Sequence, residues 1–267
     1  MEKELKKKYA ALKNYLKKLE EIVVAFSGGV DSTLLLKISN DITGLKVYAL
    51  IGKSYSTPQA EFLYAMEMAQ QIGVNPIVVE TNELNSPDYC NNALDRCYRC
   101  KKIIFGTFIS YMHEFGLRNL ADGSNYDDLS DFRPGNKALE EFGVISPFKE
   151  FGFTKGNIRE LSKELKLPSW NKEALSCLAT RISYGEPITR EKLLKIEHAE
   201  TYLRELGFSS VRARLHGDQL RIESSSEQLH RFFEENTRQR IIEKMKGIGF
   251  KYISVDMEGY RMGSMNQ

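Results

Sequence analysis

Short apolar runs alternate with longer amphipathic segments over the first two thirds of the chain. The runs at residues 22–26, 46–51 and 76–80 are rich in valine and isoleucine, which favours strands. Strands are also expected at 119–123 and 144–145, and helices at 58–72, 97–115, 137–142 and 154–165. This alternation predicts an α/β fold, a doubly wound parallel sheet with helices on both faces.

The pattern changes in the last third of the chain. The expected order there is a helix at 189–206, strands at 211–215 and 220–223, a helix at 227–245 and a strand at 252–255. This order predicts a small α+β domain. We therefore expect one domain at 1–185, which includes an N-terminal helix, and a second at 186–267 for substrate binding or oligomerisation.

Composition narrows the class of protein. The chain has 267 residues, 42% of them hydrophobic, and a net charge of +2. It can bury a substantial core, and its near-neutral charge does not favour a broad nucleic-acid-binding face. No apolar run approaches the ~18 residues that a membrane span requires, and no signal-peptide pattern opens the chain. We expect a cytoplasmic protein, in which four cysteines indicate metal binding or chemistry rather than disulfides.

A glycine-rich segment follows directly on the first expected strand and opens a helix. It reads Ser27-Gly28-Gly29-Val30-Asp31-Ser32. Adjacent glycines let a phosphate approach closely, and the N–H groups at a helix N-terminus favour an anion. The segment has neither the lysine of G-x-x-x-x-G-K-[ST] nor the G-x-G-x-x-G of dinucleotide sites. It predicts a polyphosphate site, with an ordinary strand-to-helix turn as the alternative.

The letters SGGVDS are similar to the PP-loop of the ATP pyrophosphatase superfamily, which has a HUP-like fold. These enzymes cleave ATP between the α and β phosphates and adenylate an oxygen atom. The resemblance implies that ATP is bound by Ser27, Gly28, Gly29, Asp31 and Ser32. Asp31 would position Mg²⁺ and take part in catalysis.

A second polar stretch, Asp122-Gly123-Ser124-Asn125-Tyr126-Asp127-Asp128, follows the expected strand at 119–123. Ligands of parallel sheets bind beyond the carboxyl ends of the strands, so both stretches are expected at one nucleotide. The stretch is similar to the second nucleotide-binding segment of PP-loop enzymes. That likeness implies ATP contacts from Gly123, Ser124 and Asn125 and a Mg²⁺ ligand at Asp127 or Asp128. Our prediction is Asp128, and a solvated turn is the alternative.

Cys97 and Cys100 form a C-x-x-C pair at the start of an expected helix, and Cys177 lies far from them in sequence. Thiolates at a helix N-terminus have lowered pKa values, which suits redox chemistry, zinc or an iron–sulfur cluster. Structural zinc and plain buried thiols are alternatives, although a second close cysteine pair is missing. Cys90 is expected to have no catalytic role.

Arginines alternate with apolar residues in the expected strand at 211–215. Alternation places Arg212 and Arg214 on one face, and the partner strand adds Arg221 and Glu223 on a common face. Two guanidinium groups at this spacing can bind a phosphate bidentately. An ordinary solvated strand face is the alternative.

The segments SGGVDS, DGSNYDD, DRCYRCK, PSWNKEALSCLATRISYG and ITREKLLKIEHAETYLRELGF…VRARLHGDQLRIE occur together in this chain. The combination resembles the LarE family over almost the whole length. Members of that family are ATP-dependent sulfur transferases that help to build the nickel-pincer nucleotide of lactate racemase. They adenylate a carboxylate of pyridinium-3,5-dicarboxylate mononucleotide and replace the activated oxygen with sulfur.

The resemblance implies a choice between two sulfur strategies. One type of LarE gives up the sulfur of a single cysteine at the position of Cys177. The other type also has the C-x-x-C pair and is able to hold a [4Fe-4S] cluster on three cysteines, whose open iron can bind an extra sulfide. Cys97, Cys100 and Cys177 match the second type, which is our prediction. Sacrifice of the Cys177 sulfur is the alternative.

The resemblance also implies a substrate site. Arg212 and Arg214 match positions that bind the mononucleotide phosphate, and Glu200 and Glu223 match acidic positions of that site. Arg181 lies close enough in sequence to Cys177 to contact the same substrate, so it is also expected to bind it. The implied partners are sulfide or another sulfur donor and further copies of the chain in a homo-oligomer. The rivals are a tRNA thiolation enzyme, which usually carries extra basic modules, and a non-catalytic nucleotide- or cluster-binding regulator.

Overall fold

The computed structural model describes residues 2–129, 135–173 and 176–261, and the chain divides into two compact units. The first unit is Met1–Glu83 with Asp95–Leu175, and the second is Leu84–Leu94 with Ser176–Gln267. The domain limits 1–185 and 186–267 stay a prediction.

The segment Leu84–Leu94 belongs to the second unit because side-chain and main-chain hydrogen bonds hold it there. The amide of Asn92 donates to the carbonyl oxygens of Ser183 and Glu186 at 2.7 and 2.9 Å. The N–H of Ile188 donates to the carbonyl of Cys90 at 2.8 Å. These pairings join residues about ninety positions apart, so no local sequence pattern marks them.

The first unit contains a parallel sheet in the order β3-β2-β1-β4. Its strands are β1 (Glu21–Ala25), β2 (Lys46–Lys53), β3 (Pro76–Glu80) and β4 (Leu120–Ala121). All four were expected from the apolar runs, although β4 is only two residues long. The strand expected at 144–145 is reduced to one isolated bridge, between Ala121 and Ile145. The helices of this unit are α1 (Lys3–Lys17), α2 (Val30–Asn40), α3 (Gln59–Ile72), α5 (Arg96–Glu114), α6 (Asn136–Glu141), α7 (Pro147–Glu150) and α8 (Lys155–Glu164).

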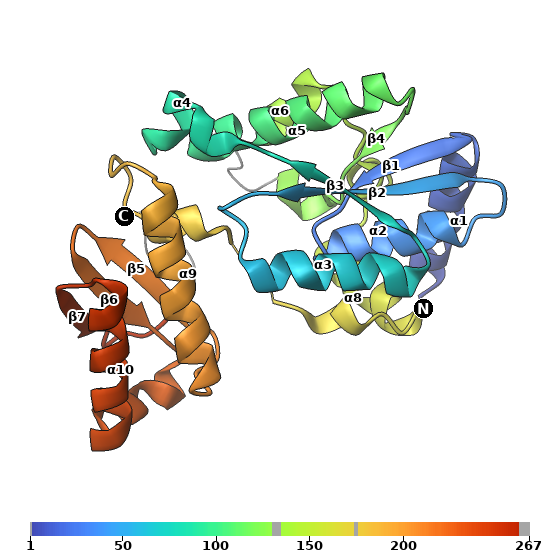
Figure 1. Ribbon diagram of the computed structural model, residues 1–267. Helices are drawn as coiled ribbons and strands as arrows, with labels where there is room; N and C mark the ends of the chain where they lie inside the picture. The colour runs from blue at the N-terminus through green and yellow to red at the C-terminus, as the bar shows by residue number, and fades with distance from the viewer. Residues whose placement is uncertain (1, 130–134, 174–175, 262–267) are drawn as a thin grey trace. The chain divides into compact units, whose positions relative to one another are not determined.

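Helices cover both faces of this sheet. In Figure 1, α2, α3 and α8 lie below it and α5 and α6 lie above it. Along β1, Ile22 and Val24 pack into the core with α2 and α3, whereas Val23 packs with α5 on the other face. This alternation is what a strand buried on both faces requires. The doubly wound α/β arrangement is therefore the one that the sequence predicts.

The strand order reverses beside β1, because β2 and β3 lie on one side of it and β4 on the other. The crevice beyond the carboxyl ends of β1 and β4 is therefore a topological switch point, the usual ligand site of an open parallel sheet. The two stretches expected to bind nucleotide, at 27–32 and 122–128, follow these two strands.

The second unit contains a three-stranded sheet in the order β5-β6-β7. The strands β5 (Arg212–His216) and β6 (Gln219–Glu223) are antiparallel, and β7 (Tyr252–Val255) pairs parallel to β6. The helices of this unit are α4 (Pro87–Cys90), α9 (Arg190–Glu205) and α10 (Glu235–Ile248), with short 3-10 helices η4 (Leu178–Arg181) and η5 (Ser226–Phe233).

The single helix expected at 227–245 is wrong. The backbone is extended at Glu234, which separates η5 from α10. Just before this break, buried Phe232 stacks on Phe208 with ring centroids 4.1 Å apart, a long-range contact. The apolar pattern of the two segments is helical in both, so it does not reveal the interruption.

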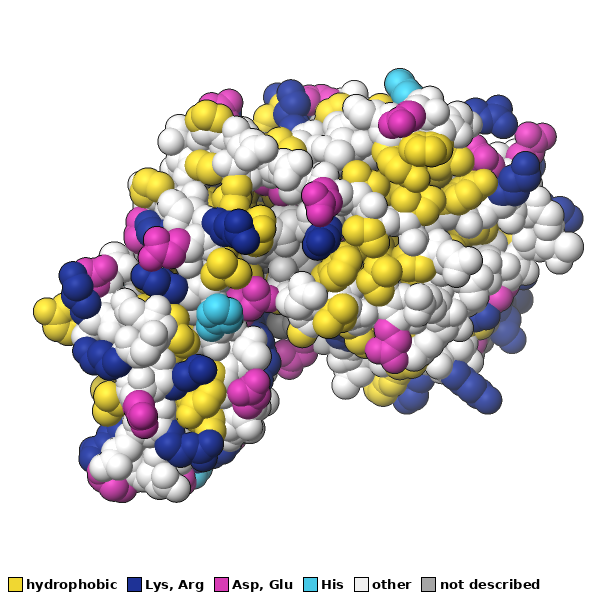
Figure 2. Space-filling model, viewed as in Figure 1, with side chains coloured by type: hydrophobic (Ala, Val, Ile, Leu, Met, Phe, Trp, Pro, Cys, Tyr) yellow, Lys and Arg dark blue, Asp and Glu magenta, His cyan; other side chains and the backbone are white. Residues whose placement is uncertain are grey.

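The face of the molecule in Figure 2 is mixed in charge. On the face that Figure 2 shows, Lys and Arg side chains lie scattered among Asp and Glu and between apolar patches. Among the described residues, no helix combines the length and apolar character that crossing a bilayer requires.

Candidate functional site: a nucleotide cavity and a buried arginine cluster

The glycine-rich loop joins β1 to α2 at the switch point. Gly28 has φ +69°, and a Cβ atom there would lie 2.9 Å from the Cα of Ala65, so only glycine fits without strain. The hydroxyls of Ser27 and Ser32 lie 3.1 Å apart and close the loop on itself. The N-terminus of α2 therefore opens toward the carboxyl end of the sheet, where an anion is favoured.

The stretch after β4 lies directly against this loop. A Cβ atom on Gly123 would lie only 2.8 Å from the backbone nitrogen of Ser32, which explains a glycine at this position. A cavity of about 360 Å³ opens where the two segments meet. Its polar wall includes Ser27, Gly29, Asp31, Ser32, Gly123, Ser124 and Asp128, and its apolar wall includes Ile51, Phe62, Ile104, Phe105 and Phe108. Both predicted nucleotide-binding stretches therefore contribute to one cavity.

The two neighbouring carboxylates after β4 have different surroundings. Asp128 is buried, lines the cavity and accepts a hydrogen bond from the backbone N–H of Asn125 at 3.0 Å. Asp127 is exposed and accepts from the backbone N–H of Lys155 at 2.8 Å, at the start of α8. The structure thus places Asp128, with Asp31, at the cavity. Asp127 instead binds the N-terminus of α8.

Lys155 pairs with the cavity residue Asp31, a contact that the sequence did not indicate. Its Nζ lies 2.5 Å from Oδ2 of Asp31, and the amide of Asn125 donates to Oδ1 of Asp31 at 3.4 Å. A lysine in the first turn of a helix opposes the helix dipole. That unfavourable position is the one local signal that could have drawn attention to it. Asp122 also lines the cavity, a position for which its sequence motif predicted no role.

The C-x-x-C pair begins α5 in the first unit. Cys97 is exposed, and Cys100 is half-buried with its Sγ 4.0 Å from Oε1 of Glu83. This glutamate beside Cys100 is itself buried, and burial raises the pKa of the Glu83 carboxyl. Cys177 precedes η4 in the second unit, and none of the four cysteines, all of them described, forms a disulfide. Within the described ranges, no three His, Cys, Asp or Glu side chains are grouped as a metal site.

Cys90 differs from the other cysteines in its surroundings. It belongs to the second unit, and its thiol donates to the carbonyl oxygen of Leu84 at 3.3 Å. Burial raises the pKa of Cys90, which keeps it as a thiol rather than the reactive thiolate. These contacts are those of a packed structural cysteine.

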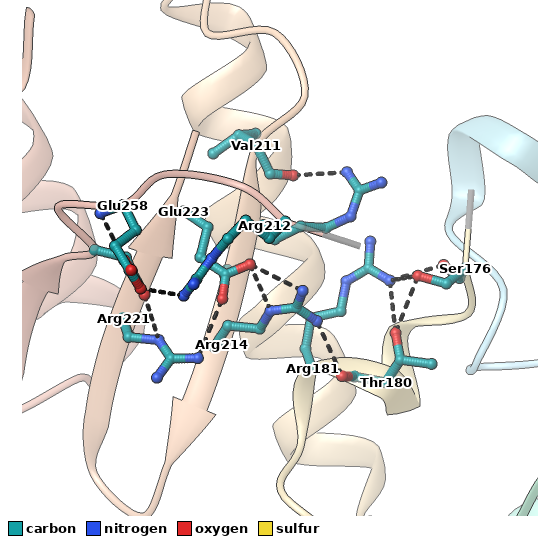
Figure 3. Close-up of polar contacts among 12 residues, drawn as sticks. Ser176, Thr180, Arg181, Val211, Arg212, Arg214, Arg221, Glu223 and Glu258 are labelled. Atoms are coloured by element: carbon teal, nitrogen blue, oxygen red, sulfur yellow. Dashed lines mark hydrogen bonds and ion pairs between the residues drawn. The ribbon is translucent and has the colours of Figure 1, made fainter. Parts of the chain in front are cut away.

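The predicted substrate residues of the second unit form one buried cluster (Figure 3). In the β5–β6 hairpin, Arg212 lies opposite Glu223 and Arg214 opposite Arg221, so the four side chains share one face. Buried Arg181 from η4 and Glu200 from α9 complete the cluster. The solvated strand face that the pattern also allowed is not found for Arg212, Arg214 and Glu223, whereas Arg221 is partly exposed.

Most of the cluster is internally paired. Arg214 donates to Oε2 of Glu223 from Nε at 3.0 Å and lies within 2.9 Å of it through Nη2. Arg181 binds Glu200 bidentately: its Nε donates to Oε1 at 2.8 Å and its Nη2 donates to Oε2 at 3.2 Å. Burial alone would raise the pKa of Glu200, but Arg181 and Arg204 outweigh it, and the pKa lies below its ordinary value. Both glutamates are therefore engaged by arginines.

Arg212 differs from its neighbours because no carboxylate of the described chain pairs with it. Its Nη1 donates to the carbonyl of Val211 at 2.9 Å, and its buried Nε has no partner there. The guanidinium carbon lies 4.7 Å from the ring centroid of Tyr260, a contact that nothing in the sequence indicated. Burial, together with nearby Arg181, lowers the pKa of Arg212. A buried, uncompensated cation is the arrangement expected of an anion-binding site.

The comparisons with known proteins can now be set beside this geometry. No known protein-family profile matches the chain. A Synechocystis sp. protein, named uncharacterized protein slr1717, is 38% identical over 263 residues, which cover 98% of both chains. The pyridinium-3,5-bisthiocarboxylic acid mononucleotide synthase of Lactiplantibacillus plantarum is 36% identical over 260 residues, covering 97% of this chain and 94% of that protein. The chain belongs to the LarE family.

A more distant similarity fits the fold of this LarE-family chain. A glutamine-hydrolysing GMP synthase component of Saccharolobus solfataricus is 26% identical over 211 residues, which cover 71% of this chain and 57% of that protein. Together with the four-stranded parallel sheet, this similarity fits a HUP-like fold. The LarE-family protein is an ATP-dependent enzyme. The predicted family and the use of ATP are confirmed, whereas the three-cysteine cluster stays a prediction.

Proposed function

We propose that this enzyme adenylates a carboxylate of pyridinium-3,5-dicarboxylate mononucleotide and converts it to a thiocarboxylate, a step of nickel-pincer nucleotide synthesis. The observation that carries the proposal is the Arg212 guanidinium. A buried cation without a carboxylate partner in the described chain needs an anion, and the phosphate of a mononucleotide supplies one. We also propose that residues 186–267 form the α+β domain that binds this substrate.

The cavity of the first unit supplies the activation step. Its apolar wall suits a purine base, and its polar wall at the N-terminus of α2 suits the phosphates. An oxygen of the substrate carboxylate attacks the α-phosphate, and the bond to the leaving pyrophosphate breaks. Asp31 and Asp128 are the carboxylates that would hold Mg²⁺ there, which would offset the charge of the pyrophosphate.

The two neighbouring aspartates test this assignment directly. We expect Asp128→Asn to slow pyrophosphate release about 10- to 100-fold and to raise the Mg²⁺ concentration needed for half-maximal rate, because a metal ligand is weakened. Asp127→Asn is the matched control and is expected to change the rate less than about threefold, since the amide oxygen of asparagine can still accept from the backbone N–H of Lys155. Pyrophosphate is measured over a Mg²⁺ titration. Equal losses in both variants would contradict the role of Asp128.

The second unit would hold the substrate. Arg212, stacked on Tyr260, is the proposed phosphate ligand, and Arg214 adds charge beside it while Glu223 fixes its orientation. Glu223 is bound to Arg214, so we propose that it acts on the substrate through that arginine. We propose that Glu200, which is bound to Arg181, belongs to the same site by supporting β5.

Cys97, Cys100 and Cys177 are the proposed ligands of a [4Fe-4S] cluster. Three thiols outside any disulfide, two of them one helical turn apart, are a donor set that suits such a cluster. When bound, the cluster would supply sulfide to the activated carboxylate. Exposed Cys97 and half-buried Cys100 are accessible at the start of α5, and Cys177 is half-buried before η4. The sulfur donor and the homo-oligomer stay predictions.

The proposed function is tested by anaerobic incubation of the full chain with ATP, Mg²⁺, sulfide and pyridinium-3,5-dicarboxylate mononucleotide. We expect mass spectrometry to show one oxygen of the nucleotide replaced by sulfur, with one pyrophosphate released for each replacement. Bulk tRNA is the parallel acceptor. Sulfur on tRNA alone, or ATP binding without pyrophosphate release, would overturn the proposal.

A further inference from the structure

The carbonyl oxygen of Cys177 is held by three donors. It accepts from the backbone N–H of Thr180 at 3.1 Å, from the Thr180 hydroxyl at 2.8 Å and from Nη1 of Arg181 at 2.9 Å. The same Nη1 contacts the carbonyl and hydroxyl oxygens of Ser176 at 2.8 and 2.7 Å. Figure 3 shows the Arg181 side chain pointing at Ser176 and Thr180. One guanidinium nitrogen therefore fixes the backbone on which Cys177 stands.

The other end of the Arg181 guanidinium reaches the substrate strand through Glu200. Nε and Nη2 of Arg181 donate to the two oxygens of Glu200. Oε1 of Glu200 also accepts from the backbone N–H of Ala213 at 3.1 Å. Ala213 lies in β5 between Arg212 and Arg214. A continuous set of hydrogen bonds thus joins the Cys177 carbonyl to the strand that carries the proposed phosphate ligand, and all of it lies in the second unit.

Arg181 and Arg212 are opposite cases. Arg181 is 0% exposed, and each of its three nitrogens donates to an acceptor of the protein. Arg212 has a buried Nε without a partner in the described chain. A guanidinium has a fixed fork of five N–H groups and no acceptor. Arg181 therefore spends its N–H donors on groups of the protein, whereas the Nε–H of Arg212 is available to donate to a ligand.

We propose that Arg181 is a positioning residue that fixes the Cys177 backbone relative to β5, and that it is not a ligand of the substrate. This inference rests on the proposed function for the importance of Cys177. Sulfur transfer needs the Cys177 sulfur at a set place relative to a substrate anchored at Arg212, and small displacements at a reacting centre cost large factors in rate. Arg181 supplies that placement through a buried pair with Glu200 in which each of its three nitrogens donates to the protein.

Arg181→Lys is the first test. Lysine keeps a positive charge beside Glu200 but lacks the planar fork that spans Glu200 and the Cys177 carbonyl. In full-length, metal-free protein without ATP or substrate, we expect iodoacetamide to alkylate Cys177 about 5- to 20-fold faster, because the segment loses its restraint. Alkylation is followed on the Cys177 peptide by mass spectrometry. The Kd of pyridinium-3,5-dicarboxylate mononucleotide is expected to change less than about threefold, since no ligand contact is lost.

Arg212→Lys is the matched control from the same cluster, with the reverse pattern expected. It should weaken binding of the mononucleotide about 10- to 100-fold, as loss of a charge-assisted fork does. The alkylation rate of Cys177 should stay that of the wild type, because the contacts of Arg212 with Val211 and Tyr260 lie outside the Cys177 segment. The two arginines are then separated by two independent measurements.

A second pair of variants keeps the test decisive if Arg181→Lys fails to fold. Thr180→Val removes the hydroxyl that joins Arg181 to the Cys177 carbonyl but leaves the Arg181–Glu200 pair intact. It should speed alkylation in the same direction, by about two- to fivefold for the loss of one to two hydrogen bonds, and Thr180→Ser should restore the original rate.

The proposal is overturned if Thr180→Val, and any folded Arg181→Lys, leave Cys177 alkylation unchanged. It is likewise overturned if Arg181→Lys weakens mononucleotide binding as Arg212→Lys does. Neither measurement requires sulfur transfer. A chain that never produces thiocarboxylate would therefore contradict the proposed function without deciding the role of Arg181.

Discussion

Replacing Cys177 by alanine should abolish thiocarboxylate formation while pyrophosphate release continues. The proposed nucleotide cavity is lined by residues of the first unit, and Cys177 is not among its lining residues. Adenylation is therefore expected to survive the change. The rate of sulfur transfer should fall by at least about a thousandfold, because removing a group that acts at the reacting centre typically lowers the rate by that factor or more. The measurement is mass spectrometry of the nucleotide beside a pyrophosphate assay in the same reaction.

The same assay separates the two sulfur strategies when Cys97→Ala is added. If three cysteines hold a cluster, Cys97→Ala and Cys177→Ala should both lose bound iron and repeated turnover. If Cys177 gives up its own sulfur, Cys97→Ala should still make one thiocarboxylate per chain and leave the Cys177 peptide short of its sulfur. Cys90→Ala is the control and should behave as wild type, because its thiol bonds the carbonyl of Leu84. Thiocarboxylate formation by Cys177→Ala would contradict both strategies.

The variant Glu200→Gln should be severely destabilised. Glu200 is fully buried between Arg181 and Arg204, and glutamine leaves the buried Arg181 charge without a counter-ion. Breaking one side of such a pair costs about 3–5 kcal/mol. Urea unfolding of the wild type and the variant measures this difference. Glu205→Gln, an exposed position on the same helix, is the control and should lie within about 0.5 kcal/mol of wild type.

The effect should depend on pH in a defined direction. Arg181 and Arg204 hold the pKa of Glu200 below its ordinary value despite burial. A carboxylate whose folded-state pKa is lowered contributes stability that is fully present above the unfolded-state pKa. This contribution is lost as the pH falls through the folded-state pKa. The gap between wild type and Glu200→Gln should therefore be constant near neutral pH and shrink in acid. A gap that widens in acid, or a variant as stable as Glu205→Gln, would contradict the assignment.

The cavity could be predicted because the segments that line it carry short, local sequence patterns. The apolar run before Ser27 predicts a strand, and the glycines after it predict a close approach that Gly28 shows against Ala65. Strands of a parallel sheet end on one edge, so the second stretch had to lie near the first. The break at Glu234 was not foreseeable from periodicity, because two helical patterns in succession look like one.

The sequence by itself determined the strands of both sheets, the glycine-rich loop, the cysteine pair and the alternation that sets Arg212 and Arg214 on one face. Each of these features depends on residues that are close together in the sequence, because local spacing of apolar and polar residues sets backbone conformation and burial. The tertiary structure alone decided which arginine has no carboxylate partner in the described chain, and it alone placed Lys155 on Asp31. It also placed the predicted Asp128, and not Asp127, at the cavity. These outcomes depend on pairings between side chains from distant segments. In a buried cluster, the charge that stays unpaired is known only when every partner is in place.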